Sequence, residues 1–325
     1  MEKAGDSTME KCGGYQAGYG DGPIWHEAYG VIWLDCAFEK IITFNPETGQ
    51  ENIYDALGQI MAIIPTTDGQ FIGIYKDGLY KLNFKQRFKS PLVLHQSWNG
   101  MNYLSEGKCG PDGHIWAGSS DSFYKSFKES PHTTNSTYPF ANSKLYSIDT
   151  TANVFVQADG MALSKGMDWD RSTKKFFHID SAKHTIYQYQ LEEKQRLYFE
   201  KVVYTFEMDE GHPSGMVIDR EGNIWVALYK SSMVAGYSKK PTRIVCINPK
   251  KRQVIKEIEL PVTHVTSCTI GGEEMDTLFI TTASETLAAE KMKLEPFSGY
   301  LIQVKIDAKG VENYEFELNN KRVNS

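Results

Sequence analysis

Histidine, serine and carboxylate side chains occur at short spacings in the second half of the chain. His212 precedes Ser214 by two residues, so both are expected on one loop, where His212 could act as a general base. His178 precedes Asp180 by two residues, and alternate residues of a strand face the same side. These spacings predict a candidate pocket. An isolated surface histidine and ordinary strand packing are the alternatives for His212 and His178.

Two common catalytic arrangements find no support in the sequence. No Gly-x-Ser-x-Gly segment is present, so a serine-hydrolase triad is not indicated. The five cysteines are widely spaced without a Cys-x-x-Cys pair, which argues against zinc-finger and thioredoxin-like sites. The first residues contain no apolar signal segment. We therefore expect reduced, mostly buried thiols in a cytoplasmic protein.

An internal repeat indicates the elements that position these residues. A short apolar run, a Gly or Asp turn and a second apolar or aromatic run recur six times, starting near positions 24, 61, 108, 166, 215 and 267. The mean step is about 49 residues, within the range of propeller blades. One such sheet cannot bury both of its faces, but six arranged radially can. The repeat predicts an all-β fold, a six-bladed β-propeller, with a pair of β-sandwiches as the alternative.

Composition and repeat boundaries narrow the organisation and the partners. We expect an N-terminal extension over residues 1–18 and a single propeller domain over 19–320, interrupted by a polar stretch at 119–142 and a helix-prone one at 285–295. The formal net charge of -6 offers no basic surface for nucleic acid or anionic membranes. The sequence contains no run of 18 consecutive apolar residues, so no membrane-spanning helix is expected. The expected partner is therefore a small-molecule substrate or ligand.

Five segments, in order along the chain, carry a family resemblance. They are Gly20-Asp21-Gly22-Pro23-Ile24-Trp25, Ser105-Glu106-Gly107-Lys108-Cys109-Gly110-Pro111-Asp112-Gly113, Ser164-Lys165-Gly166-Met167-Asp168-Trp169 with Ile179-Asp180-Ser181, Pro213-Ser214-Gly215-Met216 with the strand that follows it, and Thr266-Ser267-Cys268 with Gly271-Gly272. Together they resemble the regucalcin (senescence marker protein), gluconolactonase and luciferin-regenerating-enzyme family. The resemblance implies a six-bladed propeller, the fold that the repeat predicts independently.

The resemblance also implies a lactone-hydrolysing site with one divalent metal, usually calcium or zinc, on the propeller axis. The family's three metal ligands are a Glu, an Asn and an Asp, and the matching positions here are Asp21, Lys165 and Ser214. A charged lysine has three donors and no lone pair. We therefore expect no metal and no other cofactor, with the Lys165 ammonium replacing the cation beside Asp21 and Asp180.

The substrate-side positions have changed as well. The family's Arg-x-Asn becomes Tyr103-Leu104-Ser105, which removes a guanidinium and an amide, whereas Glu106 keeps a carboxylate where the family has Asp. The predicted catalytic residues are Lys165, Asp21 and Asp180. The predicted substrate-binding residues are Tyr103, Ser105, Glu106, Ser214, His212 and His178.

Three interpretations of Lys165 remain open at this point. It is a structural ion-pair partner, a desolvated base or Schiff-base nucleophile with a lowered pKa, or a charged group that stabilises an oxyanion. The leading hypothesis is a small-molecule enzyme of lactone- or ester-hydrolase ancestry with metal-independent chemistry. The alternatives are a non-catalytic small-molecule-binding protein that uses the same pocket, and a platform for protein interactions.

Overall fold

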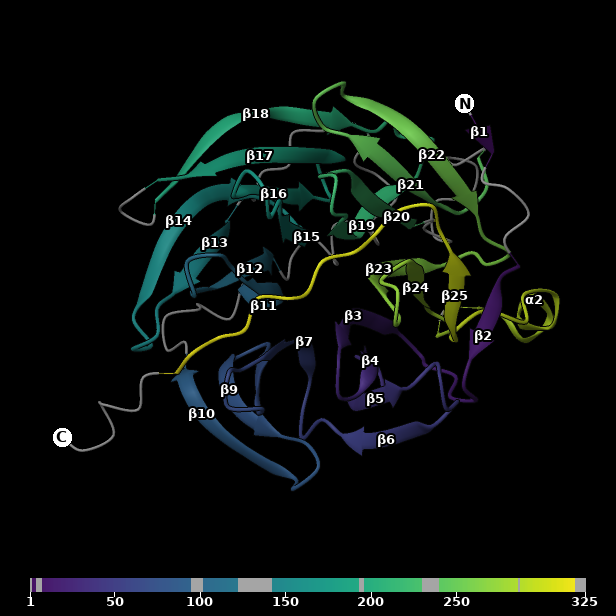
Figure 1. Ribbon diagram of the computed structural model, residues 1–325, viewed down its shortest axis with the longest axis horizontal. Coiled ribbons are helices and arrows are strands. Elements are labelled where there is room, and N and C mark those ends of the chain that lie inside the picture. The colour runs from purple at the N-terminus through teal and green to yellow at the C-terminus, as the bar shows by residue number, and fades with distance from the viewer. Residues whose placement is uncertain are drawn as a thin grey trace, which may run out of the picture.

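Six small β-sheets stand in a ring in the computed structural model of the chain (Figure 1). The structure describes residues 2–3, 8–94, 102–121, 142–192, 196–229, 240–285 and 287–318. Most of the polar stretch expected at 119–142 lies outside these residues. The helix-prone stretch contains helix α2 (Ala289–Leu294). The predicted all-β, six-bladed propeller is confirmed.

Each blade is an antiparallel sheet whose first strand lines the axis of the ring. The first three blades are β3 (Gly20–His26), β4 (Gly30–Asp35), β5 (Lys40–Phe44) and β6 (Glu51–Asp55); β7 (Ile60–Pro65), β8 (Phe71–Tyr75), β9 (Gly78–Asn83) and β10 (Phe88–Leu94); and β11 (Asn102–Cys109), β12 (Ile115–Asp121), β13 (Ser143–Ile148) and β14 (Val154–Met161). The fourth and fifth are β15 (Ser164–Trp169), β16 (Lys175–Asp180), β17 (Thr185–Leu191) and β18 (Leu197–Thr205); and β19 (His212–Ile218), β20 (Ile224–Tyr229), β21 (Arg243–Asn248) and β22 (Gln253–Glu259), with β1 (Glu2–Lys3) parallel to β22.

The sixth blade closes the ring with strands from both ends of the chain. Its inner strands are β23 (Val265–Gly271), β24 (Thr277–Thr282) and β25 (Leu301–Lys305), and its outermost strand is β2 (Glu10–Cys12). The segment expected as an extension over residues 1–18 therefore contributes two strands to the propeller, β1 to the fifth blade and β2 to the sixth. The isolated sequence could not show this, because β2 pairs with a strand almost 300 residues further along the chain.

Apolar side chains pack between neighbouring blades, and the first strand of each blade lines the axis. Blade-core tryptophans such as Trp116, Trp169 and Trp225 are almost fully buried, which agrees with the aromatic runs of the repeat. Gly166 shows how closely the inner strands approach, since a Cβ there would lie 2.7 Å from the Ser214 carbonyl. Because the inner strands pack this closely here, we look for functional side chains at the two ends of the axis.

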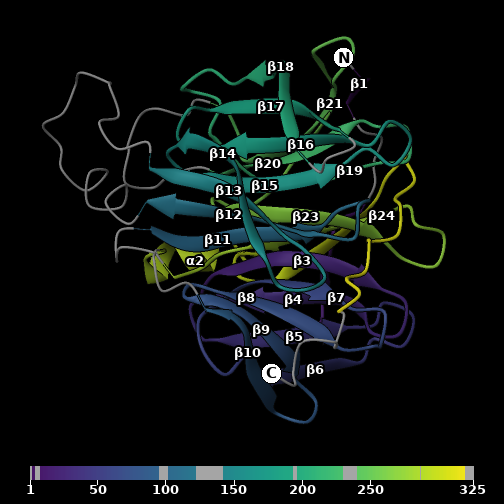
Figure 2. The ribbon, with the colours of Figure 1, turned by 90° about the vertical axis from the view of Figure 1, so that its left-hand side faces the viewer.

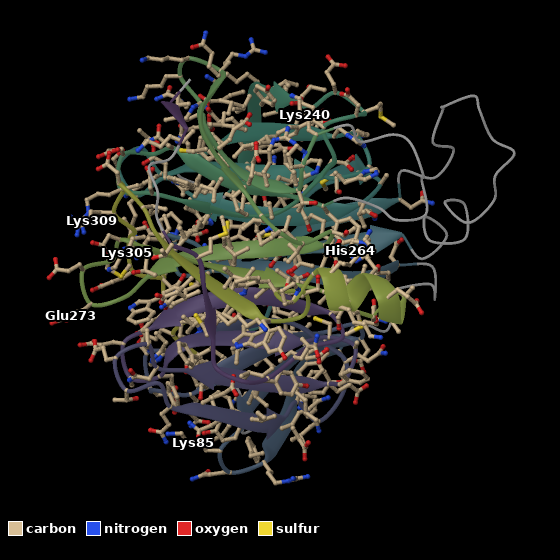
Figure 3. All side chains as sticks on the ribbon, turned by 90° about the vertical axis from the view of Figure 1, so that its right-hand side faces the viewer. Lys85, Lys240, His264, Glu273, Lys305 and Lys309 are labelled. Carbon is tan, nitrogen blue, oxygen red and sulfur yellow. The ribbon has the colours of Figure 1, made fainter. Side chains whose placement is uncertain are left out.

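The two ends of the axis differ (Figures 2 and 3). Helix α2 and His264 lie at one end, here called the upper end, and Glu273, Lys305 and Lys309 lie at the other. Residues 306–318, here called the C-terminal strap, cross the lower end over the centre of the ring (Figure 1). No helix within the described ranges is long and apolar enough to span a bilayer.

Candidate functional site

Register shifts at the upper ends of the inner strands position the candidate site. In all six blades the pairing between first and second strand slips near the start of the first strand. In the first, third and fourth blades the shift lies between Asp21 and Ile24, between Leu104 and Glu106, and between Ser164 and Met167. A bulge re-aims side chains and ends regular pairing. The shifts therefore fall where the expected site residues lie.

Lys165 and Asp21 form the ion pair that the sequence predicted. The Lys165 Nζ lies 3.7 Å from Asp21 Oδ2, with side chains 16% and 9% exposed. Burial alone lowers the pKa of Lys165, but the nearby Tyr19, Asp21, Tyr103 and Glu106 together raise it above the ordinary lysine value. Lys165 is therefore a fixed, largely buried positive charge.

Glu106 is the second carboxylate beside this charge. Burial, followed by the repulsion from Asp21, raises the pKa of the Glu106 carboxyl to about 7, although Lys165, the Gly107 N–H and Lys108 each lower it. The Gly107 N–H donates to Glu106 Oε1 at 3.1 Å. A carboxyl group with this pKa exchanges protons near neutral pH, as a general base or acid must.

Aromatic and thiol groups complete the surroundings of the pair, and the sequence analysis missed most of them. The Tyr19 ring centroid lies 6.0 Å from Lys165 Nζ, and Tyr103 carries the Lys76 ammonium 5.4 Å from its ring centroid. Burial and the Asp21 charge raise the pKa of the Cys36 thiol well above its ordinary value, so this cysteine stays protonated. We name this set the axial cluster: Tyr19, Asp21, Cys36, Tyr103, Glu106 and Lys165.

Asp180, expected as a catalytic partner of Lys165, has other contacts. Its carboxylate accepts hydrogen bonds from the backbone N–H groups of Ala162 and Leu163, each at 3.2 Å. It pairs with Lys183 at 3.4 Å. Asp180 therefore holds the segment that leads into Ser164 and Lys165. These contacts are those expected of a positioning residue.

Asp35 is the counterpart of Asp180 in the first blade. Each aspartate is the last residue of the second strand of its blade. Asp35 lies opposite Gly20, which precedes Asp21, and Asp180 lies opposite Ser164, which precedes Lys165. The Asp35 carboxylate accepts from the N–H groups of Gly18 at 3.0 Å and Tyr19 at 3.2 Å. A comparison of the repeats would have matched Asp35 to Asp180, so the sequence contained this signal.

Replacing Asp180 by asparagine should reduce stability. Hydrogen bonds to a charged acceptor contribute about 1.5–3 kcal/mol each, and Asp180→Asn removes the charge from two of them. We expect the free energy of unfolding to fall by about 1–3 kcal/mol in urea denaturation. The exposed Asp159 serves as the control. Asp159→Asn should change the free energy of unfolding by less than about 0.5 kcal/mol. Unchanged unfolding with abolished activity would instead support a catalytic role for Asp180.

His178 and Ser105 lie in the blade interiors. His178 is fully buried, its Nε2 lies 2.7 Å from Ser164 Oγ, and burial lowers the pKa of its imidazole to about 3. The Ser105 hydroxyl donates to the Ser164 carbonyl at 2.9 Å. Both residues therefore support the strand that carries Lys165.

The fifth blade contributes Ser214 and His212. Ser214 is buried beside Gly166, where the fourth and fifth inner strands pack. The His212 ring lies 4.4 Å from the His184 ring, at the boundary of the fourth and fifth blades. His212 is opposite Tyr229, whose ring stacks on His264 at 5.0 Å. Tyr229 also interacts with Lys165 electrostatically, so it is a further upper-end neighbour that the sequence analysis missed.

The residues at the implied metal position do not fit a divalent cation. Hard oxygen donors hold calcium, whereas the three matching positions supply one carboxylate, one neutral hydroxyl and an ammonium (Asp21, Ser214 and Lys165). The ammonium is charged and already pairs with that carboxylate. A divalent cation there would be repelled by the Lys165 ammonium, which has no lone pair to offer as a ligand.

Comparisons with known proteins agree with this architecture. The Bacillus subtilis protein YvrE, named as a candidate sugar lactone lactonase, is 27% identical over 303 residues, covering 91% of this chain and 94% of that protein. Human regucalcin is 24% identical over 301 residues, covering 91% and 94%.

Solved structures share the fold. Regucalcin from Agrobacterium tumefaciens, described as a calcium-binding protein, aligns with a TM-score of 0.80 at 15% identity, over 97% of this chain and 98% of that one. A luciferin-regenerating enzyme aligns with a TM-score of 0.78 at 22% identity, over 96% and 100%. The model of the SMP-30/gluconolactonase/LRE-like region matches residues 19–284. The chain therefore belongs to the SMP-30/gluconolactonase/LRE-like family.

Proposed function

We propose that the protein hydrolyses a lactone or ester of a small molecule at the axial cluster, without a metal ion. The observation that supports this is one fixed ammonium that pairs with one carboxylate and interacts electrostatically with a second, which has a pKa of about 7 (Lys165, Asp21 and Glu106). A positive charge can stabilise the oxyanion of ester hydrolysis, and a proton acceptor can activate the attacking water.

The reaction divides between these groups. Glu106, as a carboxylate, takes a proton from water while the water oxygen attacks the carbonyl carbon of the substrate. The Lys165 ammonium stabilises the negative charge that develops on the carbonyl oxygen. The tetrahedral intermediate then collapses, the bond to the leaving oxygen breaks, and Glu106 returns the proton to that oxygen. The products are a carboxylic acid and an alcohol, which remain joined when the substrate is a lactone.

The charge of Lys165 argues against covalent catalysis by its amine. A Schiff-base nucleophile must lose its proton, whereas the groups around Lys165 raise its pKa. Asp21 keeps the ammonium in place through their ion pair. Lys165 therefore serves best as a preorganised cation.

Removal of divalent metals should leave the activity intact. We expect the rate of lactone or ester opening, followed by acid release at constant pH, to stay within about twofold after dialysis against a chelator, because Lys165 supplies the stabilising charge. A metal-dependent member of the family, treated in parallel, controls for the chelation. Loss of activity that calcium or zinc restores would contradict the proposal.

A substrate panel separates hydrolysis from binding alone. Sugar lactones, aromatic lactones and simple esters are offered to the purified full-length protein, and acid release and ligand binding are measured together. Acid release that depends on Lys165 supports the enzyme. Binding to wild-type protein without acid release from any bound compound would favour the non-catalytic binding protein.

A further inference from the structure

A cavity lies on the propeller axis between the axial cluster and the C-terminal strap. The centre of a water molecule can occupy about 40 Å³ of this cavity. The inner strands and the C-terminal strap form its walls. Roughly 10–15 Å³ is enough for one ordered water. The space is therefore large enough for ordered water.

The cavity begins at the proposed general base. Glu106 belongs to the axial cluster and also lines the cavity, together with Lys108. These residues lie two apart on β11, so both face the axis, with Glu106 nearer the upper end. Glu106 therefore connects the site above with the space below.

Polar groups on several strands line this space. Lys108 Nζ pairs with Asp168 Oδ2 at 2.8 Å, and the Asp168 carboxylate also accepts from the Ile218 N–H at 2.9 Å. Ser267 and Thr269 of β23 line the opposite part of the wall. A buried water needs two to four polar partners, and the ammonium, the two hydroxyls and the Glu106 carboxylate can provide them.

The C-terminal strap forms the lower wall of this cavity through Asn313 and Tyr314. The Asn313 Nδ2 donates to the Trp25 carbonyl at 2.7 Å, and the Arg171 guanidinium lies 3.7 Å from the centroid of the Tyr314 ring. Further along, the Phe316 N–H donates to the Pro65 carbonyl at 2.9 Å. The strap is thus tied to blades on several sides of the axis.

We propose that the cavity below Glu106 is a water site that supplies the nucleophilic water from the side of Glu106 opposite the substrate. Substrate then enters at the upper end, and water reaches Glu106 from below. This assignment rests on the proposed function for its catalytic role. The occupancy of the cavity by water can be tested without any substrate.

Filling the cavity tests the proposal. Thr269→Leu replaces a wall hydroxyl by a larger apolar side chain, and Thr48→Leu, at an exposed turn, is the matched control. We expect a high-resolution crystal structure and water–protein NMR to show ordered water beneath Glu106 in the wild-type and Thr48→Leu proteins and none in the Thr269→Leu protein. For Thr269→Leu we also expect kcat to fall about tenfold or more, with KM within about twofold, since only the water is displaced.

A second variant and a second readout protect the test from misfolding. Ala62→Val narrows the same cavity from β7, and NMR of labelled Glu106 should show a higher pKa in both filled variants, because drying disfavours the carboxylate. A dry wild-type cavity, or a filled cavity with unchanged kcat and pH profile, would overturn the inference. If wild-type protein hydrolyses nothing, the proposed function fails, while the water and Glu106 measurements still decide whether the water site exists.

Discussion

The Lys165→Met variant should lose about 100–1,000-fold in kcat for lactone or ester opening, the usual loss when one oxyanion-stabilising donor is removed. Methionine keeps most of the length of the side chain but removes the charge that pairs with Asp21 at 3.7 Å. KM should change much less, because the charge acts on the oxyanion of the transition state. Steady-state kinetics on any substrate found in the panel measure both constants.

The matched control is a lysine of the same blade that lies outside the axial cluster. Lys175 pairs with Glu200 at 3.0 Å on the outer part of the fourth blade, so Lys175→Met should leave kcat within about twofold, as expected of a surface ion pair. Thermal unfolding of both variants shows whether they fold. A folded Lys165→Met protein with wild-type kcat would leave Lys165 as a structural ion-pair partner and remove it from the mechanism.

The architecture was predictable from the sequence because each hairpin carries its own local signal. The first repeat contains two apolar runs, Gly30–Asp35 and Lys40–Phe44, and these form β4 and β5. The closure was not predictable in this way. Strand β2 has no partner nearby in sequence, and its pairing with β25 depends on the ring bringing the two ends of the chain together.

The candidate site was predicted in part. The Asp21–Lys165 pair joins residues from the first and fourth blades, and the family motifs identified both positions. For Asp180, strand alternation gives the face of the side chain but not its partners. Those partners are backbone groups of Ala162 and Leu163, whose path depends on packing. Tyr19 and Cys36 border the pair without belonging to any motif that was compared.

Glu106 has a larger role in the proposed mechanism than the sequence analysis predicted for it. In the sequence it was a substrate-binding carboxylate at a position where the family has Asp. Its burial and its proximity to Asp21 make it the group with a pKa of about 7 beside a fixed cation. The same residue also lines the cavity below. In the proposed mechanism, base, oxyanion stabiliser and water therefore meet at one place on the axis.

Replacing Glu106 by glutamine should lower kcat by about 100–10,000-fold, the usual contribution of a general base. The amide keeps the shape of the side chain but does not accept the proton of the attacking water. The exposed Glu273, at the opposite end of the axis in Figure 3, provides the control. Glu273→Gln should keep wild-type kinetics. Wild-type kinetics in Glu106→Gln as well would show that Glu106 only binds substrate weakly and is not the base.

The pH profile gives the more specific form of this prediction. The base must be ionised, so kcat/KM should rise with pH and level off above an apparent pKa of about 7, the value set mainly by burial of Glu106. Asp21 raises this pKa and Lys165 lowers it. Asp21→Asn should therefore move the rise to lower pH, and the residual activity of Lys165→Met should rise only at higher pH. A profile that stays flat between pH 5 and 9 in the wild-type protein would exclude Glu106 as the base.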